Sequence, residues 1–200
     1  MSDVTIQVES KGMDNVIKTL ETYASRGNNL RPVLRRFGKI IVAGVTKNFE
    51  EQGRPSRWKP RSDLTNKIYA NQAMFGYMKK GIGKKGANAL RKGMTMAVER
   101  KLGNLILSGS GDLKKSIDDE VDSYSVKVGS ALPYARIHQL GGIITPKKSR
   151  ALFIPMGNGQ GAIRLRRVTI PARPYLVITS EEETQITDTA KLYILTGEVQ

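Results

Sequence analysis

The sequence of 200 residues predicts an α+β fold, in which a small antiparallel sheet packs against one long amphipathic helix. Apolar residues keep helical spacing over a long stretch, from about residue 30 to residue 51. Short segments with alternating apolar and polar residues gather in the C-terminal half. Helices and strands do not alternate as βαβ units, so a parallel sheet is not indicated. The length suits a single domain over residues 1–200.

Two helices are predicted near the N-terminus. The alternating residues Val4–Val8 indicate a first strand, and Met13–Ala24 keep the spacing of a helix that Gly27 ends. The second helix, over about 30–51, is the clearest element, with a broad apolar stripe. Pro32 lies in its first turn, where a missing N–H is tolerated.

The segment Gly53–Thr65 is predicted to be an extended basic loop, because two prolines and a glycine interrupt it. It contains Trp58, the only tryptophan of the chain. In one interpretation, Trp58 folds back onto the core with a cation stacked on its ring. In the other, it is an anchor that enters a pocket of a partner protein.

The middle of the chain is predicted to hold two helices with a basic segment between them. A weak helix is indicated around residues 64–78, and helical spacing resumes from Met94 up to Gly109. Between them, Lys79–Lys92 has several glycines, many cations and little apolar surface. We expect this segment of about 79–92 to be a flexible basic loop.

A strand, a turn and a short helix are predicted near residue 130. Residues 121–128 read as one strand, and Gly129–Pro133 as a turn. Apolar residues from Tyr134 to Leu140 form one side of a short helix, which Gly141 and its neighbouring glycine end.

Strands and a terminal helix complete the prediction. Ile143 and Ile144 indicate a short strand, and Ala151–Met156 with Ile163–Ile170 a β-hairpin. A last strand is expected at Tyr175–Ile178, and a C-terminal helix at 181–195.

The net charge of +15 is unevenly distributed. The window Arg54–Lys115 contains fifteen basic and three acidic residues, and Lys147–Arg173 contains seven basic residues and no acid. The part after Ser180 has a net charge of −4. This distribution predicts a polyanionic partner, a complementary protein surface, or both.

The residue types needed for catalysis or metal binding are scarce. The chain has no cysteine and a single histidine, His138, without a pattern that supplies an orienting partner or a nucleophile. Gly81–Gly86 matches G-x-G-x-x-G, but no hydrophobic strand precedes it, so a nucleotide site is not indicated. We therefore predict no enzyme, no cofactor and no metal site.

No stretch approaches the ~20 apolar residues of a membrane span, and the N-terminus lacks the pattern of a signal peptide. Together with the absence of cysteine, this predicts a protein made and used in the cytosol, or in something assembled there.

Nucleic-acid binding is a second reading of the basic segments. Aromatic residues flank the basic loop, but no sequence-reading motif is present, so contacts would be made with phosphates. The residues proposed for contact with DNA phosphates or a partner are Lys79, Lys80, Lys84, Lys85, Arg91 and Lys92.

Several motifs, in order, resemble one known family. They are Trp58-x-Pro60, Gly111-x-Leu113-x-x-Ser116-Ile117, Val128-Gly129-Ser130, Tyr134-Ala135-x-Ile137-His138-Gln139-x-Gly141-Gly142 and Ile170-Pro171-Ala172-Arg173-Pro174-Tyr175-Leu176. With the long helix before them, they resemble the phage virion morphogenesis and tail completion family of Mu-like tailed phages.

The resemblance implies a structural protein of the virion neck, assembled in the host cytoplasm, that completes the tail and joins it to the DNA-filled head. It implies a ring of copies, commonly sixfold, next to portal, adaptor or tail-terminator proteins, with double-stranded DNA passing by. It implies no enzyme and no cofactor. The alternative is a non-specific nucleic-acid-binding protein that acts in packaging or another DNA transaction. A hydrolase of the cell envelope would need a paired acid and base, which the sequence does not show.

The residues expected to contact subunits or partners lie mainly in these motifs: Trp58, Tyr134, His138, Gln139, Arg173 and Tyr175. Arg173 stands on a backbone stiffened by two prolines, which suits a fixed salt bridge, within a subunit or between subunits.

Overall fold

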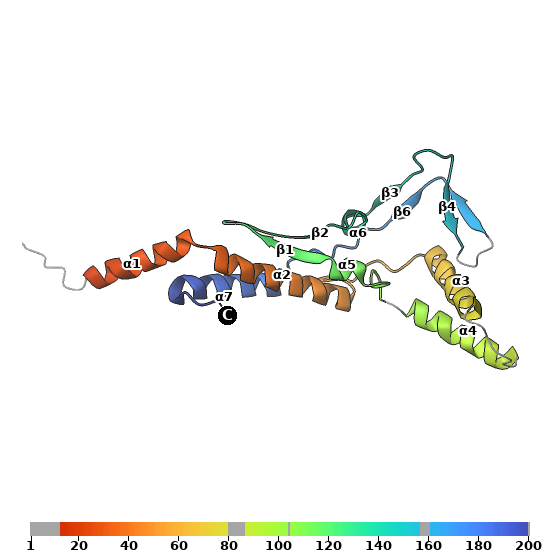
Figure 1. The fold of residues 1–200 in the computed structure, drawn as a ribbon, viewed down its shortest axis with the longest axis horizontal. Helices are drawn as coiled ribbons and strands as arrows, with labels where there is room; N and C mark the ends of the chain where they lie inside the picture. Colours follow the sequence, from red (N-terminus) through yellow and green to blue (C-terminus); the bar gives the residue numbers. More distant parts are fainter. Residues whose placement is uncertain (1–12, 80–86, 104, 157–160, 200) are drawn as a thin grey trace, which may run out of the picture. The chain divides into compact units, whose positions relative to one another are not determined.

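The structure is a computed structural model that describes residues 13–79, 87–103, 105–156 and 161–199 (Figure 1). These residues form helices and three two-stranded sheets, which confirms the α+β class. The chain divides into two compact units. The first comprises the described residues up to Val42, Asp119–Val128 and the residues from Ser180 onwards; the second comprises Ala43–Asp118 and Gly129–Thr179. Whether the chain folds as one domain stays a prediction.

The first unit contains two helices that are joined at their C-terminal ends. These are α1 (Met13–Asn28) and α7 (Ser180–Thr196), and both confirm predicted helices. The guanidinium of Arg26 donates to the carbonyl oxygens of the last residues of α7, at 2.7 Å to Ile194 and to Leu195 and 3.0 Å to Thr196. A cation at this position also interacts favourably with the helix dipole.

The long predicted helix is confirmed as α2 (Arg31–Glu51). Its apolar stripe supplies much of the core, with Val33, Leu34, Ile40, Val45 and Phe49 all buried. In the first unit, a Cβ on Gly38 would collide with the side-chain carboxylate of Asp119, so the absence of a side chain at Gly38 allows this close approach. Beside it, Lys39 pairs with the same carboxylate at 3.0 Å.

The single strand predicted over residues 121–128 was wrong. The segment belongs to two strands, β1 (Ile117–Val121) and β2 (Val126–Ser130), which pair in one sheet. The amide of Asp122 donates to the carbonyl of Ser125 at 2.8 Å, and closes the turn between them. Asp and Ser favour turns. The strand β1 was not predicted, because three of its five residues are acidic and acidic residues are uncommon in strands.

Two helices of the second unit take in half of the predicted basic loop. These are α3 (Asp63–Lys79) and α4 (Ala87–Leu102), which pack against each other. The loop prediction was wrong for Lys79, which ends α3, and for residues 87–92, which begin α4. Ala, Leu, Arg and Lys are good helix formers. Residues 80–86 lie outside the described residues. The helix α4 ends at Leu102 and not near Gly109, where the sequence predicted its end, because Gly103 follows Leu102.

The remaining strands of the second unit form two nested pairs. The strand β3 (Gly142–Ile144) pairs with β6 (Val168–Ile170), and Ile144 lies opposite Val168. Inside this pair, β4 (Leu152–Pro155) and β5 (Ala162–Leu165) form the predicted antiparallel hairpin. The strand predicted at Ile163–Ile170 is interrupted at residues 166–167. Its two parts, β5 and β6, belong to different sheets. We call residues 145–167 the β branch.

Two short helices complete the second unit. They are α5 (Asp112–Lys115) and α6 (Ala135–Leu140), and α6 confirms the short helix that Gly141 ends. The strand predicted at Tyr175–Ile178 was wrong, since this segment is irregular. The strand predicted at Val4–Val8 lies outside the described residues. Within the described parts of the chain, no helix has both the length and the apolar character needed to cross a membrane.

Candidate partner-binding groove

A cluster of three aromatic rings forms the core of the second unit. Phe49 of α2 lies with its ring centre 5.6 Å from that of Trp58, edge to face, and 5.4 Å from that of Tyr175. The indole Nε1 of Trp58 donates to the carbonyl oxygen of Pro174 at 2.8 Å. Trp58 is 7% exposed, so it folds back onto the core, as the first interpretation predicted. The ring that meets it is Phe49, in place of the expected cation.

The side chain of Gln139 connects α6 to the segment after Arg173. Its Oε1 accepts from the amides of Tyr175 (2.9 Å) and Leu176 (3.0 Å), and its Nε2 donates to the carbonyl of Leu176 (3.1 Å). These contacts take the place of strand pairing, which explains why no strand forms there. The hydroxyl of Tyr175 donates to the carbonyl of Ala135 at 3.0 Å, and burial raises the pKa of this hydroxyl.

The guanidinium of Arg173 is buried against the loop after Trp58. Its Nε donates to the carbonyl of Lys59 at 3.0 Å, and one terminal nitrogen donates to the carbonyl of Pro60 at 3.1 Å. The expected salt bridge is not formed within the described residues, where carbonyl oxygens take the place of an acid. The planar guanidinium is well suited to hold two acceptors at fixed positions. Burial, and then the charge of Arg61, lower the pKa of Arg173, while Tyr69 raises it.

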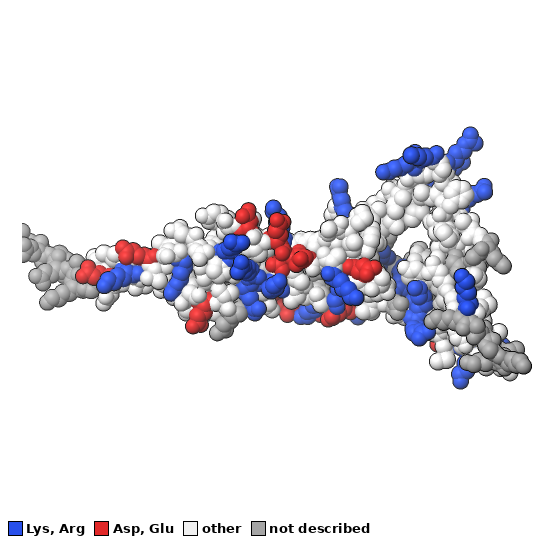
Figure 2. All heavy atoms as spheres, in the orientation of Figure 1, with Lys and Arg blue, Asp and Glu red and all other residues white. Residues whose placement is uncertain are grey.

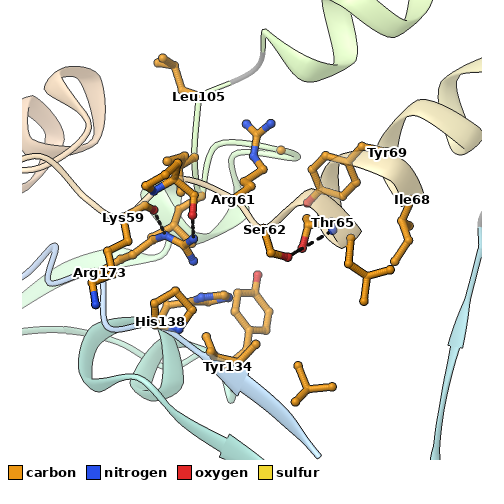
Figure 3. Close-up of a pocket in the computed structure, with 18 of the residues that line it drawn as sticks. Lys59, Arg61, Ser62, Thr65, Ile68, Tyr69, Leu105, Tyr134, His138 and Arg173 are labelled. Atoms are coloured by element: carbon orange, nitrogen blue, oxygen red, sulfur yellow. Dashed lines mark hydrogen bonds between the residues drawn. The ribbon is translucent and has the colours of Figure 1, made fainter. Parts of the chain in front are cut away.

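In front of Arg173 lies a groove with a volume of about 950 Å³ (Figure 3). Its walls come from α3, the C-terminal end of α4, α6 and the strands β4 and β6, all within the second unit. Figure 2 shows this part of the molecule hollowed between the strands and α3. Apolar side chains such as Ile68, Leu105 and Ile154 line much of it.

The charged groups that line the groove are all basic. They are Lys59, Arg61, Lys101 and Arg173, and none of the described residues that line it is acidic. Tyr69 of α3 lies between two of these cations, since the charged groups of Arg61 and Lys101 are each 5.3 Å from its ring centre. The groove therefore combines apolar surface with positive charge.

His138 lies on the α6 wall of the groove, next to Tyr134, with the two ring centres 6.0 Å apart. Its Nδ1 is buried and has no hydrogen-bond partner among the described residues. Burial, and then the positive charge of Arg173, lower the pKa of His138 from 6.5. The imidazole is thus kept neutral, which lessens the repulsion between the two side chains.

The structure separates the six predicted contact residues into two groups. Tyr134, His138 and Arg173 line the groove together. The other three, Trp58, Gln139 and Tyr175, lie behind it and hold its wall in place; their direct contact with a partner stays a prediction.

The predicted phosphate-contact residues do not line the groove where they can be placed. Lys79 lies over the ring of Phe75, at 6.0 Å from its centre, and Arg91 and Lys92 belong to α4. Lys80, Lys84 and Lys85 lie outside the described residues. The sequence reading missed Arg61, Tyr69 and Lys101 as one cluster, because they come from separate elements. Within the described parts of the chain, no three side chains of the metal-binding types lie close enough together to hold a metal.

Comparison with known proteins agrees with the motifs. The chain is 24% identical over 188 residues to "Mu-like prophage FluMu G protein 2" of Haemophilus influenzae, an alignment that covers 94% of this chain and 95% of that protein. No solved structure matches the chain. The phage virion morphogenesis family matches residues 88–194, which is more than half of the chain and includes α6, the β branch and Arg173. The chain therefore belongs to the phage virion morphogenesis family, and its role is in the assembly of a phage virion.

Proposed function

We propose that this virion assembly protein is a structural subunit of the neck, the connection between head and tail. In this proposal, copies of the chain form a ring, with six as the expected number, that completes the tail and joins it to the DNA-filled head. Its neighbours are portal, adaptor or tail-terminator proteins. The proposal includes no enzymatic activity and no cofactor.

The observation that carries the proposal is the charge of the β branch. Its six cations, Lys147, Lys148, Arg150, Arg164, Arg166 and Arg167, are all exposed, and the sequence has no acid from Ser123 to Ser180. Figure 2 shows cations gathered on this part of the molecule. A ring through which DNA passes benefits from a basic inner surface, since DNA carries one negative charge per ~1.7 Å of its length. The same surface suits an acidic neighbouring protein.

The first test is electron microscopy of lysates from a phage that lacks this gene. DNA-filled heads beside separate tails are the expected result, and joined particles in normal number would contradict the proposal. The length of the free tails shows in addition whether the protein ends tail growth.

A second test separates charge from folding. We expect that a triple variant of the β branch, with Arg164, Arg166 and Arg167 changed to Gln, lowers the yield of joined particles. The matched control is Arg35→Gln with Arg36→Gln, two exposed cations of α2 in the first unit. Each variant is supplied to the phage that lacks this gene, and joined particles are counted. If both variants restore joined particles equally well, the cations of the β branch are not used in the neck.

Non-specific binding of nucleic acid is the second candidate, and one pair of residues favours it. Phe153 and Arg164 lie opposite each other in the β4–β5 ladder, with the guanidinium 5.3 Å from the ring centre. Phe153 is 57% exposed, and an exposed aromatic ring beside cations is typical of surfaces on which bases stack.

Salt dependence separates the two candidates. The logarithm of DNA affinity is expected to fall by about 0.9 per phosphate contact for each tenfold rise in salt. A steep slope in a free monomer, reduced in the triple variant of the β branch, supports the second candidate. A ring that does not bind DNA supports the neck proposal.

A further inference from the structure

We propose that the groove of one copy binds α1 of a neighbouring copy, and that this contact links the subunits. The inference rests on the proposed ring, and it names the two surfaces that hold the ring together.

The first surface is an uncovered apolar stripe on α1. Met13, Val16, Ile17 and Leu20 are 51%, 52%, 46% and 59% exposed, and α1 has no buried residue at all. Their spacing of three, four and seven residues places them on one face of the helix. Within the first unit, only the C-terminal end of α1 lies beside α7 (Figure 1). A continuous apolar face of this kind is typical of a site that binds another protein.

The charges of the two surfaces are complementary. Asp14 and Glu21 are seven residues apart on α1, so both lie along the same edge of the apolar stripe. Lys18 lies between them on this edge, which leaves an excess of one negative charge. The groove offers Lys59, Arg61 and Lys101, and no acid among its described lining residues. An apolar helix face with an acidic edge therefore meets an apolar groove with cations, which favours α1 over a basic or purely polar segment.

The dimensions also agree. A volume of 950 Å³ corresponds to a cube with an edge of about 10 Å, close to the diameter of one α-helix with its side chains. The groove can thus take the apolar side chains of about two helical turns, which is the length of the stripe from Met13 to Leu20.

The contact is heterologous, because α1 and the groove are different surfaces of the chain. Each copy then has one of each, so every copy can bind a neighbour on both sides. Such contacts form a ring if the rotation between copies closes, and a two-fold dimer is not their natural product.

The test uses the absence of cysteine in the chain. A variant with Leu20→Cys and Leu105→Cys carries one thiol on α1 and one on the groove wall. Phage particles assembled with this variant are treated with a bifunctional maleimide and separated under denaturing conditions. We expect a ladder of cross-linked copies up to the size of the ring.

Other outcomes contradict the inference. Cross-linking only within single copies means that α1 binds its own groove. Dimers from the Leu20→Cys variant alone mean that α1 packs against α1. Joined particles without any cross-linking mean that the two surfaces do not meet, although the neck proposal would still stand. Conversely, separate heads and tails in the absence of the gene support the neck proposal whatever the cross-linking shows.

Charge reversal provides an independent test that leaves the apolar surfaces intact. Arg61→Glu with Lys101→Glu in the groove is expected to lower the yield of joined particles at least tenfold. Adding Asp14→Lys and Glu21→Lys on α1 is expected to restore it. No rescue, in a quadruple variant that unfolds at the same urea concentration as the wild type, contradicts the proposed pairing.

Discussion

The indole Nε1 of Trp58 and the carbonyl oxygen of Pro174 are joined by a hydrogen bond of 2.8 Å. The same carbonyl accepts a second, longer bond of 3.3 Å from Nδ2 of Asn48. The long helix, the loop that follows it and the segment before Tyr175 therefore meet at one backbone atom. This junction lies behind the groove and fixes the position of Arg173, the neighbouring residue.

Two substitutions of Trp58 should destabilise the second unit to different extents. Trp58→Phe keeps an aromatic ring but removes the hydrogen bond, which is expected to cost about 1 kcal/mol of unfolding free energy. Trp58→Ala also leaves a cavity, and should cost about 3–5 kcal/mol. Urea unfolding followed by circular dichroism measures both. The control is Tyr124→Ala, at a side chain that is 74% exposed, which should change the free energy by less than about 0.5 kcal/mol.

Replacing Gly141 by alanine should destabilise the fold strongly. The residue has a φ of 70°, and an added Cβ would lie 2.6 Å from the backbone nitrogen of Ala172. Gly111 is a matched control, since its φ is 81° but the nearest atom to its Cβ would be 3.7 Å away, at the end of a lysine side chain. We expect Gly141→Ala to cost at least about 2 kcal/mol more than Gly111→Ala. Equal losses would mean that the backbone around Ala172 moves aside freely.

Changing Gln139 to leucine should expose a defined part of the backbone. The variant leaves the amides of Tyr175 and Leu176 without their acceptor, and each unsatisfied group costs about 1–3 kcal/mol when it is buried. Hydrogen exchange of these two amides should accelerate more than that of α2. Gln185→Leu, at an exposed position of α7, should leave the exchange of both amides unchanged. Protection that persists in Gln139→Leu would show that another acceptor replaces the side chain.

The neutral imidazole of His138 should make stability depend on pH. Its pKa is lowered in the folded state, so the unfolded chain binds a proton at a higher pH than the folded chain does. The stabilising contribution is complete above 6.5, the unfolded value, and is lost as the pH falls below 6.5 towards the lower, folded value. His138→Gln should remove this dependence, which urea unfolding at several pH values measures.

The single histidine allows a direct check of the same assignment. An NMR titration should give a pKa below 6.5, and Arg173→Gln should bring it closer to the ordinary value, because the charge of Arg173 contributes to the shift. A pKa at or above 6.5 in the wild-type protein would contradict the assignment.

Much of the fold could be predicted because its signals are local. The apolar stripe of α2 and the glycine that ends α6 each lie within a few turns of chain. The strand expected at Tyr175–Ile178 fails for the opposite reason, since its amides are satisfied by Gln139, a residue far away in the sequence. The strand β1 was missed for the same reason, because its acids are not typical of a strand and one of them, Asp119, pairs with the distant Lys39 of α2.

The site was predicted only in part, for a similar reason. Tyr134, His138 and Arg173 stood out because they occur in dense motifs. Arg61, Tyr69 and Lys101 come from a loop and two helices, and only the packing of α3 against α4 brings their side chains together. No regular spacing in the sequence predicts that these three side chains form a cluster.

The three residue pairs between β3 and β6 close the base of the β branch, so the chain leaves and re-enters the core at a fixed point. Ile154, which lines the groove, is carried on that branch. Substitutions or changes of length within the branch thus alter one wall of the groove, and leave the aromatic cluster around Phe49 untouched. The shape of the groove can therefore change through a short stretch of coding sequence, while selection for folding acts on a different set of codons.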